Sequence, residues 1–173
     1  MTAAIRPFEA ADWSSLWPIL QTTNSGGDTF AFSPDSSESD MYQAWIALPV
    51  ATFVSCGGDG TVLGSYFIKQ NQPGLGAHVC NAGYVVAAQA RGQGIAAAMC
   101  EHSQQEARAR GFRAMQFNLV VATNTRAVRL WQRMGFAIVG TLPAAYCHRS
   151  LGYVDALVMF KSLRADSQAY ELQ

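Results

Sequence analysis

Apolar and polar residues follow two different periods along the chain, and the changes of period mark its elements. Apolar residues at helical spacing predict four helices, at residues 11–21, 41–48, 95–110 and 124–134. Alternating or continuous apolar runs, rich in β-branched residues, predict seven strands, at residues 3–7, 50–56, 61–69, 78–86, 113–121, 136–140 and 153–161. This mixture of strands and helices predicts a domain of the α/β (α+β) class.

The segments between these elements are rich in turn-forming residues. Residues 57–60, Gly-Gly-Asp-Gly, predict a tight turn that joins two strands into a hairpin. Residues 22–40 are rich in Ser, Gly, Asp and Thr and predict one long loop, and long loops in compact domains are often functional. The 173 residues suit a single domain, which we place at residues 1–165, followed by a polar C-terminal tail at residues 166–173.

The composition is that of a folded chain without a strong electrostatic preference. Hydrophobic residues make up 50%, charged residues 14%, and the formal net charge is zero, which gives no general attraction to nucleic acid or to an acidic membrane. No apolar run reaches the roughly 18 residues that a membrane span needs. The four cysteines form no C-x-x-C pair and nothing resembles a signal peptide, so we expect reduced thiols in a cytoplasmic protein. His78, Cys80, Cys100 and His102 are better explained as core or surface residues than as ligands, and we predict no metal site.

Acidic residues are unevenly distributed along the chain. No Asp or Glu lies between Glu106 and Asp155. The same stretch contains Arg108, Arg110, Arg113, Arg126, Arg129, Arg133 and Arg149. These arginines form either an ordinary solvated surface or a face that meets a phosphate-bearing ligand, because guanidinium groups suit phosphate.

A glycine turn is the first motif with a chemical meaning. Gly92 and Gly94 lie between an apolar strand and the helix predicted at residues 95–110. Backbone N–H groups of such a turn, with the positive end of the helix, can hold a pyrophosphate, and Ala96 and Ala97 keep the first helical turn slim. The turn also fits the dinucleotide pattern G-x-G-x-x-A, but no acid follows where the ribose would need one. A glycine turn without any ligand is a further alternative.

The same turn resembles a motif of a known family. Arg91-Gly92-Gln93-Gly94-Ile95-Ala96 is similar to the R/Q-x-x-G-x-G/A motif of the GNAT N-acetyltransferases. The resemblance implies that the loop binds the pyrophosphate of acetyl-CoA and that the strand ending Tyr84-Val85-Val86 lies along the pantetheine arm. It also implies that a backbone N–H near Val86 is the oxyanion donor. The implied GNAT fold has a mixed central sheet of about seven strands, splayed near the cofactor and flanked by about four helices.

A second motif begins at Asn124, a residue well suited to cap a helix. The run from Asn124 through Ala127 and Trp131 to Gly135-Phe136 resembles the family's N-x-x-A-x-x-x-Y-x-x-x-G-F element. In the family the asparagine helps to hold the coenzyme, and the tyrosine often protonates the departing thiolate. Here Trp131 replaces that tyrosine, and an indole N–H donates hydrogen bonds but is not a useful acid. Another residue, water, or hydrogen bonds to the thiolate must then take over this task.

A narrower resemblance covers residues 63–163, and the segments that carry it are Leu63–Lys69, Cys80–Tyr84, Phe117–Val120 and Val154–Ala156. These segments are similar to the fungal acetyltransferases of azetidine-2-carboxylate and proline analogues. That group uses two asparagines near the acceptor, and they correspond to Asn81 and Asn118, although both also suit a sheet bulge or a sheet edge. Relatives often carry an acid on the strand that corresponds to residues 78–86. This chain has Cys80 and Asn81 in that region. A water chain, His78 or Asp155 could remove the amine proton. Asp155 sits in an apolar strand, a costly place for a carboxylate unless it is functional or paired with an arginine.

These resemblances imply an acetyl-CoA-dependent N-acetyltransferase, an acyltransferase, that transfers acetyl directly from the thioester to a small amine or amino acid, a proline-like imino acid included. The family often forms dimers, so we expect a homodimer. The alternatives are a non-catalytic coenzyme A-binding module and a protein or peptide N-acetyltransferase. The implied cofactor-binding residues are Tyr84, Val85, Val86, Arg91, Gly92, Gln93, Gly94, Ile95, Ala96, Ala97, Asn124, Ala127 and Trp131. The implied catalytic residues are Asn81, Asn118, Val86 and Asp155.

Overall fold

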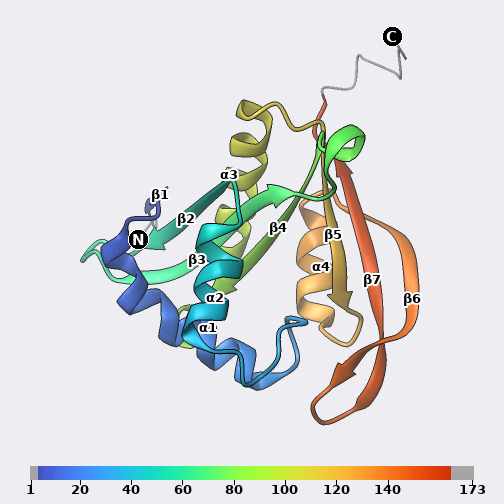
Figure 1. Ribbon diagram of the computed structural model, residues 1–173, viewed down its shortest axis with the longest axis horizontal. Coiled ribbons are helices and arrows are strands. Elements are labelled where there is room, and N and C mark those ends of the chain that lie inside the picture. The colour runs from blue at the N-terminus through green and yellow to red at the C-terminus, as the bar shows by residue number, and fades with distance from the viewer. Residues whose placement is uncertain (1–3, 165–173) are drawn as a thin grey trace.

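The computed structural model describes residues 4–164, whose strands form one seven-stranded sheet in the order β1-β2-β3-β4-β5-β7-β6 (Figure 1). The strands β4 and β5 are parallel and all other neighbours are antiparallel, so the sheet is mixed, as predicted. The strands are β1 Ala4–Pro7, β2 Ala51–Cys56, β3 Val62–Gln70, β4 Val79–Val86, β5 Ala114–Val121, β6 Ala137–His148 and β7 Gly152–Ser162. Ala3 and the predicted tail lie outside the described residues, and the single domain at residues 1–165 stays a prediction.

Helices cover both faces of this sheet (Figure 1). On one face, α1 and α2 pack through a cluster that contains Leu16, Trp45 and Phe67. On the other face, α3 and α4 pack through a cluster that contains Met99 and, at its margin, Trp131. The helices are α1 Trp13–Gly26, α2 Glu38–Tyr42, α3 Ile95–Ala109 and α4 Thr125–Arg133, and a π-helical turn, Gln43–Ala47, continues α2. Within residues 4–164, no helix combines the length and the apolar character that crossing a bilayer demands.

The long loop predicted at residues 22–40 is shorter in the structure. Helix α1 continues to Gly26 and ends at Gly27, which adopts φ +63°. The polar residues Thr23 and Asn24 are buried in its last turns, and the Asn24 side-chain amide donates to the Ser33 carbonyl. Polar composition therefore predicted a loop where long-range contacts stabilise a helix.

The strand predicted at residues 136–140 is also longer, because β6 continues past Pro143 to His148. Proline is tolerated here because β6 is the edge strand. The pairing of β6 with β7 shifts register between Leu142 and Tyr146, and Ala144 in this bulge adopts φ 50°.

Strands β4 and β5 diverge soon after they start. Their pairing within the described chain consists of Val79–Ala114 and Cys80–Met115. Asn81, the next residue of β4, bridges the start of the gap, because its side-chain Nδ2 donates to the Gln116 carbonyl at 2.8 Å. Beyond this point β4 follows β3 while β5 follows β7, which produces the predicted splay.

Alternate residues of β4 direct their backbone groups into this gap. The Val79 carbonyl accepts from Asn71 and the Ala87 N–H donates to Leu63, so the odd-numbered residues face β3. The His78 carbonyl accepts from the Arg113 N–H, on the β5 side. Because backbone direction alternates along a strand, the N–H groups of three even-numbered residues point toward the gap. These residues are Ala82, Tyr84 and Val86.

An ion pair fastens β1 to the start of α1. The Arg6 guanidinium donates twice to the buried Asp12 carboxylate, at 2.7 Å each, and the Glu9 N–H donates to it at 2.8 Å. These bonds, the Arg6 bonds above all, hold the pKa of Asp12 below its ordinary value. A carboxylate with a lowered folded-state pKa stabilises the fold above its unfolded pKa and loses this effect as the pH falls through the folded one.

We therefore expect Asp12→Asn to lower the free energy of unfolding at pH 7 by about 1–2 kcal/mol. The difference in free energy of unfolding between the variant and wild type should shrink in acid, because protonation of Asp12 weakens the Arg6–Asp12 pair in the wild-type protein. Urea unfolding of both proteins from pH 7 to pH 3 measures this. A cost that stays constant over the whole range would contradict the assignment.

Candidate active site

A cavity of about 660 Å³ lies at the open end of the gap, between the last residues of β4 and the loop that follows β5. Its walls come from both faces of the sheet: α3 and α4 on one side, and the end of α1 with the β6–β7 hairpin on the other. Every predicted cofactor-binding residue except Gln93 lines it, namely Tyr84, Val85, Val86, Arg91, Gly92, Gly94, Ile95, Ala96, Ala97, Asn124, Ala127 and Trp131. Gln93 is exposed, and its side-chain amide donates to the Gln89 carbonyl at 3.2 Å.

The glycine turn leaves the N-terminus of α3 open to the cavity. Gly92 and Gly94 adopt φ +85° and +80°, and Gly94 caps α3 without a side-chain hydrogen bond. A Cβ built on Gly94 would meet nothing within 4 Å, so the space in front of the helix is free. Backbone N–H groups of a first helical turn that lack a capping side chain are donors for an anion. The turn therefore fits a pyrophosphate.

Two arginines of the acid-free stretch, Arg126 and Arg133, also line the cavity. The Arg126 guanidinium lies over the turn, because its Nη2 would be 3.6 Å from a Cβ on Gly92. Both side chains belong to α4, whose start faces the start of α3 across the cavity. This placement favours the phosphate-facing interpretation for Arg126, in the first turn of α4, whereas Arg133 is the last residue of that helix and only lines the cavity.

The second motif forms the wall opposite β4. The Asn124 Oδ1 accepts from the Ala127 N–H at 3.2 Å, which caps α4 as expected. Trp131 packs against Tyr84 and Phe117, with ring centroids 4.9 and 5.1 Å apart. Its indole N–H donates to no acceptor within residues 4–164, so it remains available to a ligand. The Tyr84 hydroxyl bonds Ser103 at 2.7 Å, and burial raises the pKa of Tyr84 well above its ordinary value, so this phenol stays protonated.

The asparagines predicted near the acceptor lie outside this cavity, on the face covered by α1 and α2. Side chains of Asn81 and Val85 share a face of β4, and Val85 belongs to the α1–α2 cluster. Asn118 lies in a bulge of β5, where it accepts from the Gln116 side chain at 2.8 Å and donates to Asn71 at 2.7 Å. The two asparagines therefore lie on adjacent strands, and Gln116 links them. Asn81 donates to its backbone carbonyl and Asn118 accepts from its side chain.

Asp155 and His78, considered as proton acceptors, do not line the cavity. Asp155 is exposed, and its Oδ1 accepts from the Ala144 N–H at 2.9 Å, which fixes the bulge in β6. The ion pairs of the described chain are Arg6–Asp12 and Arg110–Glu106, so the salt bridge considered for Asp155 does not occur there. His78 is exposed at the start of β4.

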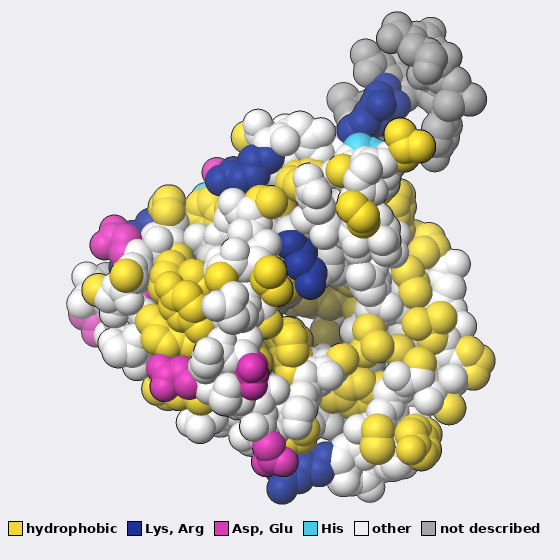
Figure 2. Space-filling view, viewed as in Figure 1, with side chains coloured by type: hydrophobic (Ala, Val, Ile, Leu, Met, Phe, Trp, Pro, Cys, Tyr) yellow, Lys and Arg dark blue, Asp and Glu magenta, His cyan; other side chains and the backbone are white. Residues whose placement is uncertain are grey.

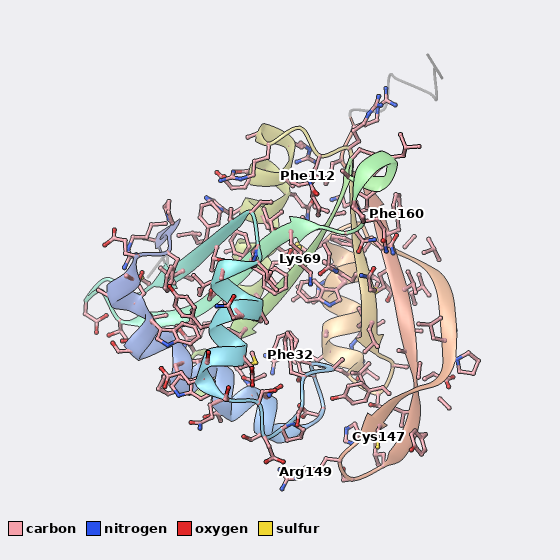
Figure 3. All side chains as sticks on the ribbon, in the orientation of Figure 1. Phe32, Lys69, Phe112, Cys147, Arg149 and Phe160 are labelled. Atoms are coloured by element: carbon pink, nitrogen blue, oxygen red, sulfur yellow. The ribbon has the colours of Figure 1, made fainter. Side chains whose placement is uncertain are left out.

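Sequence reasoning missed the wall built by the segment after α1 and the β6–β7 hairpin. The residues involved are Thr23, Asp28, Thr29, His148 and Leu151. The two segments lie side by side (Figure 1), since the Arg149 N–H donates to Gly27 at 3.2 Å and the Tyr146 hydroxyl donates to Phe30 at 3.1 Å. Figure 3 shows Arg149 where the hairpin meets this segment. No periodic pattern in the sequence predicts this contact between the segment after α1 and the β6–β7 hairpin.

The face covered by α1 and α2 is hollowed near its centre, beside the gap (Figure 2). A basic side chain borders the hollow, and in the same orientation Figure 3 labels it as Lys69. Among the described residues, no three His, Cys, Asp or Glu side chains come together in a group that could hold a metal ion.

Comparison with known proteins defines the class. The model of the acetyltransferase (GNAT) family matches residues 13–136, and the chain belongs to this family. The family is one of acetyltransferases, and the acyltransferase class and the cofactor acetyl-CoA predicted from the sequence agree with it.

The individual relatives agree with this assignment. N-acetyltransferase aca1 of Schizosaccharomyces pombe is 37% identical over 99 residues, which are 57% of this chain and 47% of that protein, so the match spans about half of its length. A GCN5-related N-acetyltransferase from Kribbella flavida has a TM-score of 0.88 at 42% identity, over 93% of this chain and 98% of that one. A phosphinothricin acetyltransferase from Sinorhizobium meliloti, in complex with acetyl-CoA, has a TM-score of 0.84 at 21% identity over 94% and 89%, which shows the common fold. The predicted GNAT fold and the resemblance to fungal N-acetyltransferases are confirmed.

Proposed function

We propose that this acetyltransferase transfers the acetyl group of acetyl-CoA directly to the nitrogen of a small amine or amino acid, proline-like imino acids included. The observation that supports this most is that one cavity, at the open end of the gap, has walls from both faces of the sheet, so that donor and acceptor can meet there from opposite faces. On the acceptor face, the hairpin and the loop after α1 restrict the entrance, which suits a small molecule better than a folded protein.

The cofactor is held by groups from both motifs. The N–H groups of the glycine turn and of the first turn of α3 bind the pyrophosphate, and Arg126 adds positive charge. Tyr84 and Val86 line the pantetheine path beside Trp131. When bound, acetyl-CoA supplies a thioester whose carbonyl carbon bonds to the amine nitrogen while the coenzyme thiol leaves.

The gap-facing N–H groups of β4 stabilise the charge that develops on the acetyl oxygen. Val86 was expected in this role, and by the alternation along β4 the N–H groups of Tyr84 and Ala82 point in the same direction. Such pre-positioned donors cost no reorganisation during the reaction. The Trp131 N–H, which has no partner in the described chain, is a hydrogen-bond donor for the departing sulfur.

Asn81 and Asn118 position the acceptor, and water removes its proton. An amide binds an amine or a carboxylate without titrating, so neither asparagine is a base. His148 lines the cavity, but the Ser150 N–H donates to its Nδ1 at 3.2 Å and occupies the lone pair that a base would use. The exposed Asp28 carboxylate at the cavity wall can take the proton from water. Asp155 instead keeps the β6 bulge in shape.

Release of free thiol tests the function. The protein is incubated with acetyl-CoA and a panel of amines, amino acids, proline analogues and peptides, and we expect thiol release with the small acceptors. No release across the panel, together with tight acetyl-CoA binding by calorimetry, would instead indicate a non-catalytic binding module. Peptides that outcompete free amino acids would indicate protein acetylation.

A homodimer and a cytoplasmic location complete the proposal. The edge strand β6 exposes Ile138, Val139 and Leu142 by 42%, 60% and 40%, an apolar edge that a second copy could cover. We expect sedimentation at micromolar concentration to give a dimer and Val139→Lys to give a monomer, and a wild-type monomer would contradict this.

All four cysteines are free, three of them buried, which suits a reducing compartment. Fractionation of the native host would test the location.

A further inference from the structure

Lys69 stands at the end of β3, on the face where the acceptor binds. It is paired in register with Asn81, so the two side chains are neighbours across β3 and β4. It shares its side of β3 with Phe67, and its Nζ lies 5.6 Å from the centroid of the Phe67 ring. The ammonium group therefore lies over an aromatic ring, and the Lys69 side chain borders the hollow (Figures 2 and 3).

The surroundings of Lys69 are aromatic on one side and amide-rich on the other. Phe67 packs on Trp45 with ring centroids 4.9 Å apart, and Trp45 packs on Phe30 at 5.5 Å. Across β4 and β5 lie the neutral amides of Asn81, Gln116 and Asn118. Neither ion pair of the described chain involves Lys69.

Lys69 is partly buried as a residue, and its ammonium group forms no ion pair with a carboxylate of the described chain, so this positive charge is available to an anion. The Phe67 ring provides only a weak attraction for the ammonium group, and the neighbouring amide groups carry no net charge. An incoming carboxylate forms a charge-assisted hydrogen bond, which is about twice as strong as a neutral one. The neighbouring aromatic side chains at the same time suit an apolar group on the ligand.

We propose that the acceptor is a small amino acid with an apolar side chain, and that Lys69 binds its carboxylate. This inference rests on the proposed function, and it narrows the acceptor from amines in general to amines that carry a carboxylate. Asn81 marks the point where β4 and β5 part, and Lys69 is one strand away on the same face. A carboxylate at Lys69 therefore leaves the α-nitrogen close to the gap, where the acetyl group arrives.

The experiment compares amino acids with the amines that remain when the carboxylate is deleted. The pairs are L-alanine and ethylamine, L-leucine and 3-methylbutylamine, L-phenylalanine and phenethylamine, and L-proline and pyrrolidine. Thiol release is measured for wild type, Lys69→Met, which keeps the apolar stem, and Lys69→Arg, which keeps the charge. Calorimetry with acetyl-CoA and thermal unfolding check that each variant is folded and binds the cofactor.

Wild type should prefer the amino acid in each accepted pair at least about tenfold in kcat/KM, equivalent to one charge-assisted hydrogen bond. Lys69→Met should lower kcat/KM for the amino acid about 10- to 100-fold, mainly through KM, and leave the matching amine unchanged. Lys69→Arg should restore most of the loss. Equal wild-type rates within pairs, or an equal loss for both members in Lys69→Met, would overturn the inference and leave the proposed function standing. Thiol release from none of the eight compounds would overturn both.

Discussion

Gly94→Glu is expected to abolish acetyl-CoA binding, with a loss of affinity of at least about 100-fold. Gly94 precedes the first turn of α3, and a side chain there would extend into the open space in front of the helix. The new carboxylate would compete for the N–H donors and repel the pyrophosphate. One such charge pair at 4 Å costs about 4 kcal/mol at an effective dielectric constant of 20.

The chain offers a matched control in Gly60→Glu. Gly60 adopts φ +85°, close to the +80° of Gly94, and a Cβ on either residue meets nothing within 4 Å. Gly60 lies in the turn between β2 and β3 and does not line the cavity. The two variants carry similar backbone strain and the same added charge, so calorimetry with acetyl-CoA should separate them. Unchanged affinity in Gly94→Glu, or an equal loss in both, would remove the glycine turn from the binding site.

Asn81→Ala is expected to lower turnover about 100-fold, the effect of a misplaced acceptor, while acetyl-CoA affinity stays within a few-fold of wild type. The Asn81 side chain faces α1 and α2, away from the groups that hold the cofactor, and it ties β4 to Gln116 where the gap opens. Loss of this amide should displace the acceptor and slightly widen the gap without changing the glycine turn.

Steady-state kinetics, calorimetry and thermal unfolding together separate this role from a structural one. Gln105→Ala is a suitable control, because Gln105 is exposed on α3 and does not line the cavity. It should retain both turnover and affinity. A fall in acetyl-CoA affinity that matches the fall in turnover of Asn81→Ala, with a large loss of stability, would mean that Asn81 only joins the strands.

Local features of the sequence were sufficient for the cofactor side of the site. Gly92 and Gly94 require neighbours within a few residues only, a strand before them and a helix after them. Asn124 caps α4 through the N–H three residues further on. Interactions of such short range depend on particular residue types at a fixed spacing in the sequence. The turn, the cap and most cavity-lining residues could therefore be predicted.

Errors arose where distant segments decide the conformation. Thr23 and Asn24 are polar, yet the packing of α1 against the sheet keeps them helical and buried. The strand predicted at residues 136–140 continues past Pro143 in β6, because an edge position tolerates proline. Asp155 was expected in an apolar environment, but it is exposed, and its carboxylate accepts from the Ala144 N–H in the bulge of β6.

The sequence by itself determined the family, the cofactor and the glycine turn at Arg91–Ala96, because each depends on contiguous residues. The tertiary structure decided which distant residues lie on the other side of the sheet from that turn. Only the divergence of β4 and β5 opens the gap in the sheet, and only the alternation of β3 and β4 places Lys69 beside Asn81 on the face opposite α3. Pairing across strands depends on register, and register follows from packing over the whole sheet rather than from any short stretch of chain.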